Sequence, residues 1–261
     1  MIAEAKIKYF GWSSFMIESP GGNLLFDPFF RKMYGVKYSD PKDFAGTKVI
    51  CITHGHFDHY IDSIRLLKAG DAVVVSSKKV CDHLHSTYGI TRERLFPLQP
   101  YEQTLRGDFK ITAFEWRHRV VNFMRIVKAH WVLGLHFAWI SLVQAPFHAP
   151  YYGFLVEMPT GLRIMNYCEG FSNCMDVGEV RELGRRMKPD ILLAGIQLDF
   201  EDYVAQGVEV LSPKTLVLFH PHEALFEKVG LKSKPPQVFI DKVRERTPRI
   251  QIILASIQSY V

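Results

Sequence analysis

A run of metal-ligand side chains directly follows an apolar stretch near the N-terminus. The stretch is Val49–Ile52, and the run after it is Thr53-His54-Gly55-His56-Phe57-Asp58-His59. Three histidines and one aspartate fall within six residues of a chain that has 11 histidines in 261 positions. Imidazole nitrogens bind Zn, Fe, Ni or Cu, and carboxylate oxygens complete sites for Zn, Fe or Mn. The pattern therefore predicts a metal site where a buried strand ends.

Ligand-type residues also follow three later strands of the expected sheet structure. They are His118 after Lys110–Glu115, Glu169 after Leu162–Tyr167, and His220 after Leu216–Phe219. Each would lie at the C-terminal end of its strand, as the histidine run does. A single ion in a protein site commonly takes four ligands. Six or seven ligands from four strand ends therefore favour two metal ions.

The remaining elements are predicted from apolar periodicity and turn residues. Early strands are expected at Lys6–Phe10, Ser14–Glu18, Leu24–Phe26, Val49–Thr53 and Ala72–Val75. Later strands at Ile191–Ala194 and Ile250–Leu254 alternate with helices at Val177–Met187, Tyr203–Leu211 and Val238–Arg246, and another helix is expected at Ile61–Lys68. This order predicts helices packed outside sheets.

An uncharged segment separates the two halves. From Ala129 to Val156 the chain has no Asp, Glu, Lys or Arg. Its core, Trp131–Val143, is shorter than the ~20 residues that span a bilayer. A buried or interfacial helix fits better. The basic residues Arg119, Arg125 and Lys128 precede it, so an apolar, aromatic surface would have a basic edge.

Composition limits the class of protein. A length of 261 residues is enough for a sizeable core, and a hydrophobic content of 48% is ordinary for a globular protein. The net charge of +5 is spread along the chain, which suits an anionic substrate but does not require nucleic acid. The four cysteines match no zinc-ribbon spacing, and the start lacks a secretory apolar region. We therefore expect a cytoplasmic protein that does not bind nucleic acid.

With these residues in place, the chain resembles the metallo-β-lactamase superfamily. The residues that carry the resemblance are Asp27 in Leu-Phe-Asp-Pro, the His54–His59 motif, His118, the acidic position after the strand that ends at Tyr167, and His220. The opening Tyr9–Phe15 and the late Pro213–Thr215 resemble the branch of ascorbate-6-phosphate lactonase and N-acyl-phosphatidylethanolamine phospholipase D. The resemblance implies one α/β domain over 1–261, a four-layer αββα sandwich with an apolar helical insert at approximately 120–150.

The resemblance also implies a ligand set for two divalent metal ions, with zinc expected first and manganese or iron as alternatives. His54, His56 and His118 would hold the first ion, and Asp58, His59 and His220 the second. His222 is a rival for His220, which is preferred because it directly follows its strand. Asp27 would orient the ligating histidines through hydrogen bonds.

Glu169 departs from the pattern of this superfamily. The bridging carboxylate there is usually Asp in a Gly-Asp-Thr turn, whereas this chain has Cys168-Glu169-Gly170. Glutamate is one methylene longer than aspartate. It could bridge both ions, bind only one of them, or leave the second site weak.

The expected chemistry is hydrolysis by a metal-bound hydroxide, because a bound metal lowers the pKa of water towards ~7. The catalytic group would be His54, His56, Asp58 and His59, with Asp58 orienting the hydroxide. We expect a dinuclear hydrolase of a phosphodiester or phosphorylated, lipid-like substrate. The first alternative is a lactonase or carboxylic-ester hydrolase with the same metals. The second, from another class, is a metal-binding redox or catalytically silent member of the fold.

The partners follow from the same features. We expect a small-molecule or lipid-like anionic substrate, whose binding residues the sequence does not identify. The segment 120–150 could cap the active site, contact a membrane surface peripherally or pair with another subunit, and we expect a homo-oligomer. An exposed stripe of Trp131, Leu135 and Trp139 would favour the membrane or lipid interpretation.

Overall fold

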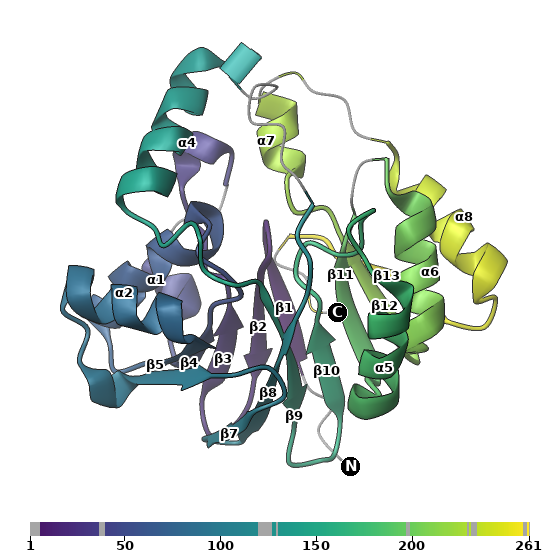
Figure 1. Cartoon of the computed structure of the whole chain (residues 1–261), viewed down its shortest axis with the longest axis horizontal. Helices are drawn as coiled ribbons and strands as arrows, with labels where there is room; N and C mark the ends of the chain where they lie inside the picture. Colours follow the sequence, from purple (N-terminus) through teal and green to yellow (C-terminus); the bar gives the residue numbers. More distant parts are fainter. Residues whose placement is uncertain are drawn as a thin grey trace.

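Two β-sheets pack face to face, and helices cover the outer face of each sheet (Figure 1). The computed structural model describes residues 6–36, 40–119, 127–128, 130–196, 199–228, 230, 234–257 and 260. The helices α1, α2 and α4 lie on one side of the sandwich, and α5, α6 and α8 lie on the other. The expected four-layer αββα sandwich is confirmed.

The first sheet is built from the N-terminal part of the chain. Its strands, in spatial order, are β1 (Lys6–Gly11), β2 (Ser14–Glu18), β3 (Asn23–Phe26), β4 (Thr47–Cys51), β5 (Val73–Ser77) and β6 (Leu95–Leu98). The pairs β1–β2 and β2–β3 are antiparallel, whereas β3 to β6 run parallel. The parallel strands are nearly continuous apolar runs, as strands buried on both faces are.

The second sheet holds the remaining strands. In spatial order they are β13 (Gln251–Leu254), β12 (Thr215–Phe219), β11 (Ile191–Gly195), β10 (Arg163–Asn166), β9 (Tyr152–Glu157), β8 (Phe109–Glu115) and β7 (Gln103–Arg106). The pairs from β10 to β13 are parallel, and those from β7 to β10 are antiparallel. Parallel strands need crossovers, and the helices between them supply these connections.

The described helices of eight or more residues are α1 (Phe57–Ala69), α2 (Lys78–Tyr88), α4 (Trp131–Val143), α5 (Val177–Met187), α6 (Glu201–Leu211) and α8 (Pro236–Arg246). The shorter helix α7 spans Glu223–Lys228, and 3₁₀ turns lie at Lys32–Tyr34, Pro41–Phe44 and Arg92–Arg94. Among the described residues, no helix is both long enough and apolar enough to cross a bilayer.

Three apolar clusters fill the spaces between the four layers. One lies between the sheets, where Phe15 and Phe26 of the first sheet meet Phe154 and Phe219 of the second. The other two lie between each sheet and its covering helices. Large aromatic side chains therefore hold the sandwich together. The C-terminal ends of the strands remain available for the polar residues that follow them.

Some boundaries and elements differ from the prediction. Helix α1 begins at Phe57 rather than Ile61, which places Asp58 and His59 on a helix instead of in a loop. The strands β6, β7 and β9 were not predicted. Tyr152–Glu157 lies at the end of the uncharged segment, where a continuous apolar run does not distinguish a strand from a buried helix. The apolar core 131–143 is a helix, as expected.

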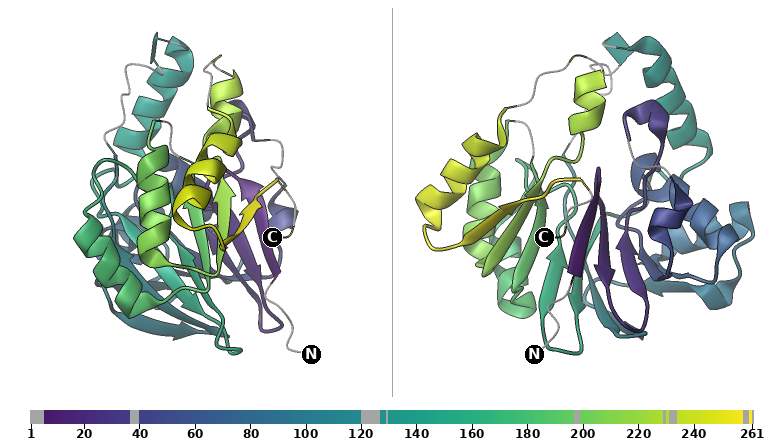
Figure 2. Two further views of the ribbon diagram at one scale, coloured as in Figure 1. Left: turned by 90° about the vertical axis from the view of Figure 1, so that its right-hand side faces the viewer. Right: turned by 180° about the vertical axis from the view of Figure 1, so that it is seen from behind.

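Figure 2 shows that α4 and α7 extend beyond the same end of the sandwich. Helix α7 begins directly after His222, and the segment that returns from α4 leads into β9. The two projecting helices therefore belong to the end of the molecule that carries the histidine cluster.

Candidate metal centre

The histidine motif combines a turn with the first turn of a helix. Strand β4 ends at Cys51, and His56 is the N-cap of α1, with φ −68° and ψ 147°. Asp58 and His59 therefore lie in the first helical turn. A carboxylate there interacts favourably with the positive end of the helix dipole. Four ligand-type side chains are thus presented by one short connection.

Gly55 fits this connection because it has no side chain. A Cβ at Gly55 would lie 2.0 Å from the carbonyl oxygen of Pro146, in the segment that returns from α4. The ring of Phe147 stacks on His56 with 4.9 Å between ring centroids. The amide of Tyr152 donates to the carbonyl of Thr53 at 2.8 Å. The segment from Pro146 to Tyr152 therefore packs against the histidine motif and supports its conformation.

Two groups of potential ligands face each other at this end of the sheets. The first consists of His54, His56 and His118, and the second of Asp58, Glu169 and His222. Within each group the potential ligand atoms lie within 4.8 Å of one another. Four strand ends contribute to these groups, after β4, β8, β10 and β12. The fold therefore brings ligand-type residues from separate strands together, as the sequence predicts.

Glu169 lies between the two groups. Its Oε2 is 3.0 Å from His118 Nε2, on the side of the first group. Its Oε1 is 3.5 Å from His222 Nε2 and 3.4 Å from His59 Nε2, on the side of the second group. The two oxygens of one carboxylate thus face two different groups. A carboxylate that bridges two ions would require this placement, and a bridge is one of the three roles named above for Glu169.

The second group contains His222 and not His220, which was preferred from the sequence as the ligand. His222 Nε2 lies 3.9 Å from Asp58 Oδ2. Both ring nitrogens of His220 are buried without a hydrogen-bond partner among the described residues, and its ring packs on Phe226. It lines a separate cavity with Tyr9 and Glu223. The strand ends at Phe219, and the turn that follows brings His222 to the cluster.

A hydrogen-bond network fixes the histidines from behind. Asp27 Oδ2 accepts from His59 Nδ1 at 2.9 Å, and Asp27 Oδ1 accepts from the Thr53 amide at 2.8 Å. The Thr53 hydroxyl donates to Asp27 at 2.7 Å and lies 2.9 Å from His54 Nδ1. With both Nδ1 atoms engaged, the Nε2 atoms are the ones left to act as ligands. Asp27 therefore lies where an orienting residue is needed.

Cys168 forms a third close group with His54 and His59. Its thiol lies 3.7 Å from His59 Nδ1 and 3.8 Å from Asp27 Oδ2. It thus sits on the side of the histidines that already bonds to Asp27 and Thr53. The Nε2 atoms of His54 and His59, which are left to act as ligands, point away from that side. We therefore leave Cys168 out of the proposed ligand set.

Burial keeps the imidazoles of His54, His56 and His222 neutral. It lowers the pKa of His54 well below its usual range, with the charges of neighbouring histidines acting in the same direction. Burial likewise lowers the pKa of His56 and of His222 to about 4. Neutral imidazole is the form that binds a metal. These side chains are therefore ready to act as ligands at neutral pH.

His59 behaves in the opposite way because carboxylates surround it. Burial disfavours its charged form, but Asp58, Cys168 and Asp27 together raise the pKa of His59 well above its usual range. Burial would raise the pKa values of Asp58 and Glu169, but His59 lowers that of Asp58 and His118 lowers that of Glu169. In the metal-free protein a proton on His59 thus balances buried negative charge.

The site fits a metal ion because several of its buried imidazole nitrogens form no hydrogen bond among the described residues. Nε2 of His54 is buried without a hydrogen-bond partner among the described residues. The buried Nε2 of His59 forms no hydrogen bond there either and lies 3.3 Å from Asp58 and 3.4 Å from Glu169. Nε2 of His118 meets Glu169 at 3.0 Å, but not along the direction of a hydrogen bond. Buried polar atoms without partners are costly. A cation between these nitrogens and the carboxylates would satisfy them.

Three further residues at the site were not identified from the sequence as site residues. Thr53 holds Asp27, and only its position before the motif could have indicated this. The Tyr151 hydroxyl lies 3.5 Å from His56 Nε2. Arg119 follows His118, accepts from His118 Nδ1 through its carbonyl at 2.6 Å, and lowers the pKa of His222. Its buried Nε has no hydrogen-bond partner among the described residues.

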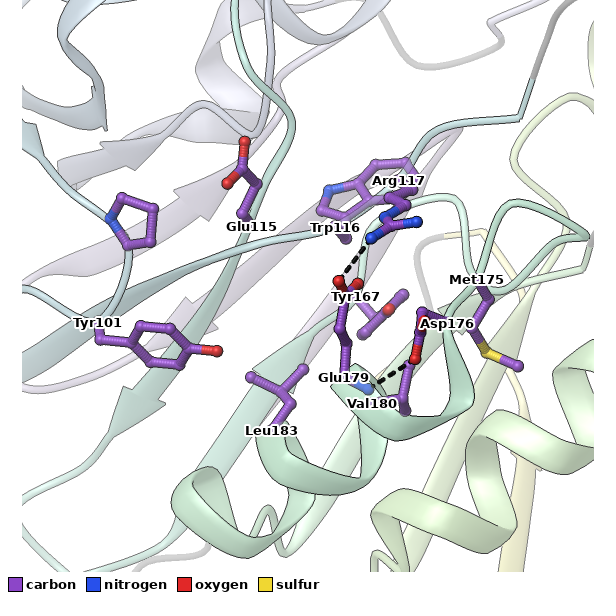
Figure 3. A pocket seen from close by; sticks show the side chains of 11 residues that line it. Tyr101, Glu115, Trp116, Arg117, Tyr167, Met175, Asp176, Glu179, Val180 and Leu183 are labelled. Carbon is purple, nitrogen blue, oxygen red and sulfur yellow. Dashed lines mark hydrogen bonds and ion pairs between the residues drawn. The ribbon is translucent and has the colours of Figure 1, made fainter.

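A separate cavity of about 420 Å³ lies beside the metal groups but contains none of their residues. Figure 3 shows Tyr101, Trp116 and Tyr167 around it, with Arg117 paired to Glu179. The Trp116 ring lies 5.4 Å from the His118 ring. Trp116 therefore stands between the cavity and the cluster, and the two are distinct sites.

Comparisons with known proteins agree with this geometry. The family model described as beta-lactamase superfamily domain matches residues 6–197. A protein of Rubrobacter xylanophilus named UPF0173 metal-dependent hydrolase is 27% identical over 202 residues, which are 75% of this chain and 72% of that protein. A Salinibacter ruber protein with the same name is 40% identical over 83 residues, but that match covers 32% of this chain and 36% of the relative.

Among solved structures, the fold is similar to that of Igni18, a metallo hydrolase from Ignicoccus hospitalis. The TM-score is 0.70 with 18% identity, over 98% of this chain and 97% of that chain. At this identity the likeness concerns the fold. The family model covers most of the chain, from β1 to the end of β11. The chain therefore belongs to the metallo-β-lactamase superfamily.

Proposed function

We propose that this chain is a metal-dependent hydrolase that holds two divalent cations and cleaves a phosphodiester or another phosphorylated substrate. One observation carries the proposal: Glu169 places one carboxylate oxygen beside each of two ligand groups. The names of the Rubrobacter and Salinibacter relatives support hydrolysis. The motifs at Tyr9–Phe15 and Pro213–Thr215 add the resemblance to the lactonase and phospholipase D branch.

The proposed ligands are His54, His56 and His118 for one ion and Asp58, His59 and His222 for the other, with Glu169 shared. Zinc is the first expectation for a set rich in imidazole, and manganese or iron would also suit the carboxylates. When bound, a divalent ion supplies Lewis-acid chemistry, because it lowers the pKa of water and polarises a phosphoryl or carbonyl oxygen.

The chain's own residues would orient the water and move its proton. Asp58 is ionised, because His59 holds the pKa of its carboxyl below the usual range although burial acts in the opposite direction. Its Oδ2 can accept a proton from an attacking water, as a general base does. Burial and the charge of Glu169 raise the pKa of Tyr151. Its hydroxyl therefore stays protonated and can donate to an oxygen of the substrate.

Arg119 favours an anionic substrate. It directly follows His118, and its charge acts on His222 in the second group. It forms no ion pair among the described residues, whereas Arg117, two positions earlier, is paired with Glu179. An arginine that lacks a carboxylate partner is suited to bind a phosphate. A neutral lactone has no charged group for Arg119 to bind.

The test measures kcat/KM of the zinc- and manganese-loaded protein on a phosphodiester, a phosphomonoester and a neutral lactone. Arg119→Met should lower kcat/KM for the phosphodiester about 10- to 100-fold, the effect of losing a hydrogen bond to a charged group. Activity on a lactone should not change. Arg117→Met is the matched control, because this arginine lines the other cavity.

Two results would contradict the proposal. Preferential turnover of the lactone, unaffected by Arg119→Met, would establish the lactonase alternative instead. Full metal content without hydrolysis of any of these substrates would favour a redox or catalytically silent member of the fold. Elemental analysis of the same samples separates a failure of catalysis from a failure of metal binding.

A further inference from the structure

Helix α4 exposes an apolar face of six large side chains. They are Trp131, Val132, Leu135, Trp139, Leu142 and Val143, each between 50% and 73% exposed. At 100° per residue these positions fall on one third of the helix circumference. Scattered apolar residues are normal on a surface, but a contiguous patch of this kind marks an interaction site. Two tryptophans within it strengthen this conclusion, because tryptophan is enriched where an apolar surface meets water.

The other face of α4 anchors the helix to the protein. Leu133 and Ile140 are buried against α1. The Phe137 ring packs on Phe57 with 4.6 Å between centroids, and His136 Nδ1 lies 2.8 Å from the Tyr34 hydroxyl. The fold thus fixes the orientation of the helix and leaves the exposed face outside the core. The stripe of Trp131, Leu135 and Trp139 is presented as a rigid surface.

A basic groove adjoins the C-terminal end of α4. It has a volume of about 660 Å³, and its lining includes Val143 of α4, Ile61 and Ile64 of α1, and the cations Arg31, Arg65 and Lys68. Among the described residues that line it, none is acidic. Arg31 is paired with Asp62 at 2.8 Å, but Arg65 and Lys68 form no ion pair within the described residues. Two exposed cations therefore flank the apolar face.

The charges of Arg65 and Lys68 distinguish two occupants of this surface, a second copy of the chain and an anionic bilayer. In a symmetric dimer the same patch meets itself, so Arg65 and Lys68 of both copies would approach one another. An anionic bilayer instead offers hydrocarbon for the apolar face and phosphates for the cations. From Ala129 to Val156 the chain carries no charged residue that would resist burial in the interface.

We propose that α4 docks on an anionic lipid bilayer, with Trp131, Leu135, Trp139 and Leu142 in the interfacial layer and Arg65 and Lys68 on lipid phosphates. A helix in this position lies on the membrane and does not span it. The docked face belongs to the end of the molecule that carries the candidate metal centre (Figure 1). Docking is independent of the proposed hydrolysis, because it can be measured on binding alone.

The experiment uses the full chain with vesicles of phosphatidylcholine, alone or mixed with phosphatidylglycerol, at low and high salt. Cosedimentation and tryptophan emission are the readouts. Trp12 and Trp116 are buried, so a blue shift on binding would report Trp131 and Trp139. We expect binding to the phosphatidylglycerol vesicles that is at least tenfold stronger than to phosphatidylcholine alone and weaker in high salt.

Variants with matched controls locate the surface. Leu135→Glu and Leu142→Glu should abolish binding, whereas Leu105→Glu should not, although Leu105 on β7 is just as exposed at 66%. The double variant Arg65→Gln, Lys68→Gln should weaken binding about tenfold or more, and Arg185→Gln on α5 should leave it unchanged. Circular dichroism checks that each variant is folded.

The proposal is overturned if neither vesicle binds the protein, or if both bind it equally. It is also overturned if the α4 variants bind like the parent chain. If light scattering gives a dimer that Leu135→Glu dissociates, while no vesicle binds, the surface is an interface between two copies instead.

Discussion

The two ligand groups of the candidate metal centre differ in charge. His54, His56 and His118 are imidazoles only, whereas the second group combines His222 with the carboxylates Asp58 and Glu169. Burial lowers the pKa of His54 and of His56, so these two imidazoles of the first group are neutral at pH 7. The second group is anionic, and a proton on His59 balances part of its charge. Metal binding to the second group should therefore release the proton of His59, whereas His54 and His56 carry no proton to release.

The largest effect is expected from Glu169→Gln, because it removes the carboxylate that faces both groups. The variant keeps the side-chain volume and loses the charge. We expect metal content to fall from two ions per chain to one or none, measured by elemental analysis after loading with zinc. Glu169→Asp serves as the control that keeps the charge. Two ions per chain in Glu169→Gln would show that the groups do not share this residue.

His222→Ala and His220→Ala form the next test, since only two positions separate them. Removal of His222 should cost one ion per chain, because it belongs to the second ligand group. Removal of His220 should leave two ions bound, because it belongs to neither ligand group and lines a separate cavity. The reverse result would restore the assignment made from the sequence and contradict the geometry described here.

Asp27→Asn should have a smaller effect, because it changes the orientation of ligands rather than a ligand. Loss of such a partner typically lowers metal affinity about 10- to 100-fold. Competition with a chelator would measure this change. Asp62→Asn is the control, since Asp62 is an equally buried carboxylate that bonds to Arg31 and the Phe30 amide instead. Equal losses of affinity in the two variants would mean a general effect on stability.

The smallest effect concerns the pH dependence of the metal-free protein. His56 and His222 have folded pKa values of about 4, below the unfolded value of about 6.5. Between these values the unfolded chain binds protons that the folded protein does not, so stability falls as pH decreases. The slope is about 1.4 kcal/mol per pH unit for each such proton.

His59 acts with the opposite sign. Its pKa is raised, so its contribution is present below the unfolded value and is lost as pH rises through the folded value. Below about pH 6.5 His59 is protonated in both states and adds no slope, so urea unfolding of the metal-free protein at several pH values between 4 and 6.5 tests His56 and His222. The variant His56→Asn, His222→Asn should show a shallower slope over this range. An unchanged slope would mean that other groups titrate there.

The comparison also explains what the sequence could predict. His54, His56, Asp58 and His59 come from one connection, so their spacing reveals the cluster. The order of strands and helices predicts helices packed outside sheets, and the resemblance to the superfamily implies the αββα arrangement. Glu169 and His118 were identified because each follows a strand. His222 was not preferred because the direction of the turn after Phe219 depends on packing against Trp12 and Phe226. Tyr151 lacks any sequence signal of its own, and Thr53 has only its position directly before the motif.

Helix α4 shows another limit of sequence patterns. The apolar run predicts its bounds, 131–143, because a continuous uncharged stretch of this length suits one helix. The pattern does not reveal which face is buried, since apolar residues surround the whole helix. Only the contacts with Phe57 and Tyr34 determine that Leu133 lies inside and Leu135 outside.

Gly55 has a consequence for protein engineering. Its backbone touches Pro146, so the histidine motif and the segment returning from α4 form one rigid module. A designer who grafts only the six-residue motif onto another scaffold would leave it without its outer support. An alanine at Gly55 would place its Cβ against the carbonyl oxygen of Pro146. The portable unit is the motif together with residues 146–152, and a transplant should carry both.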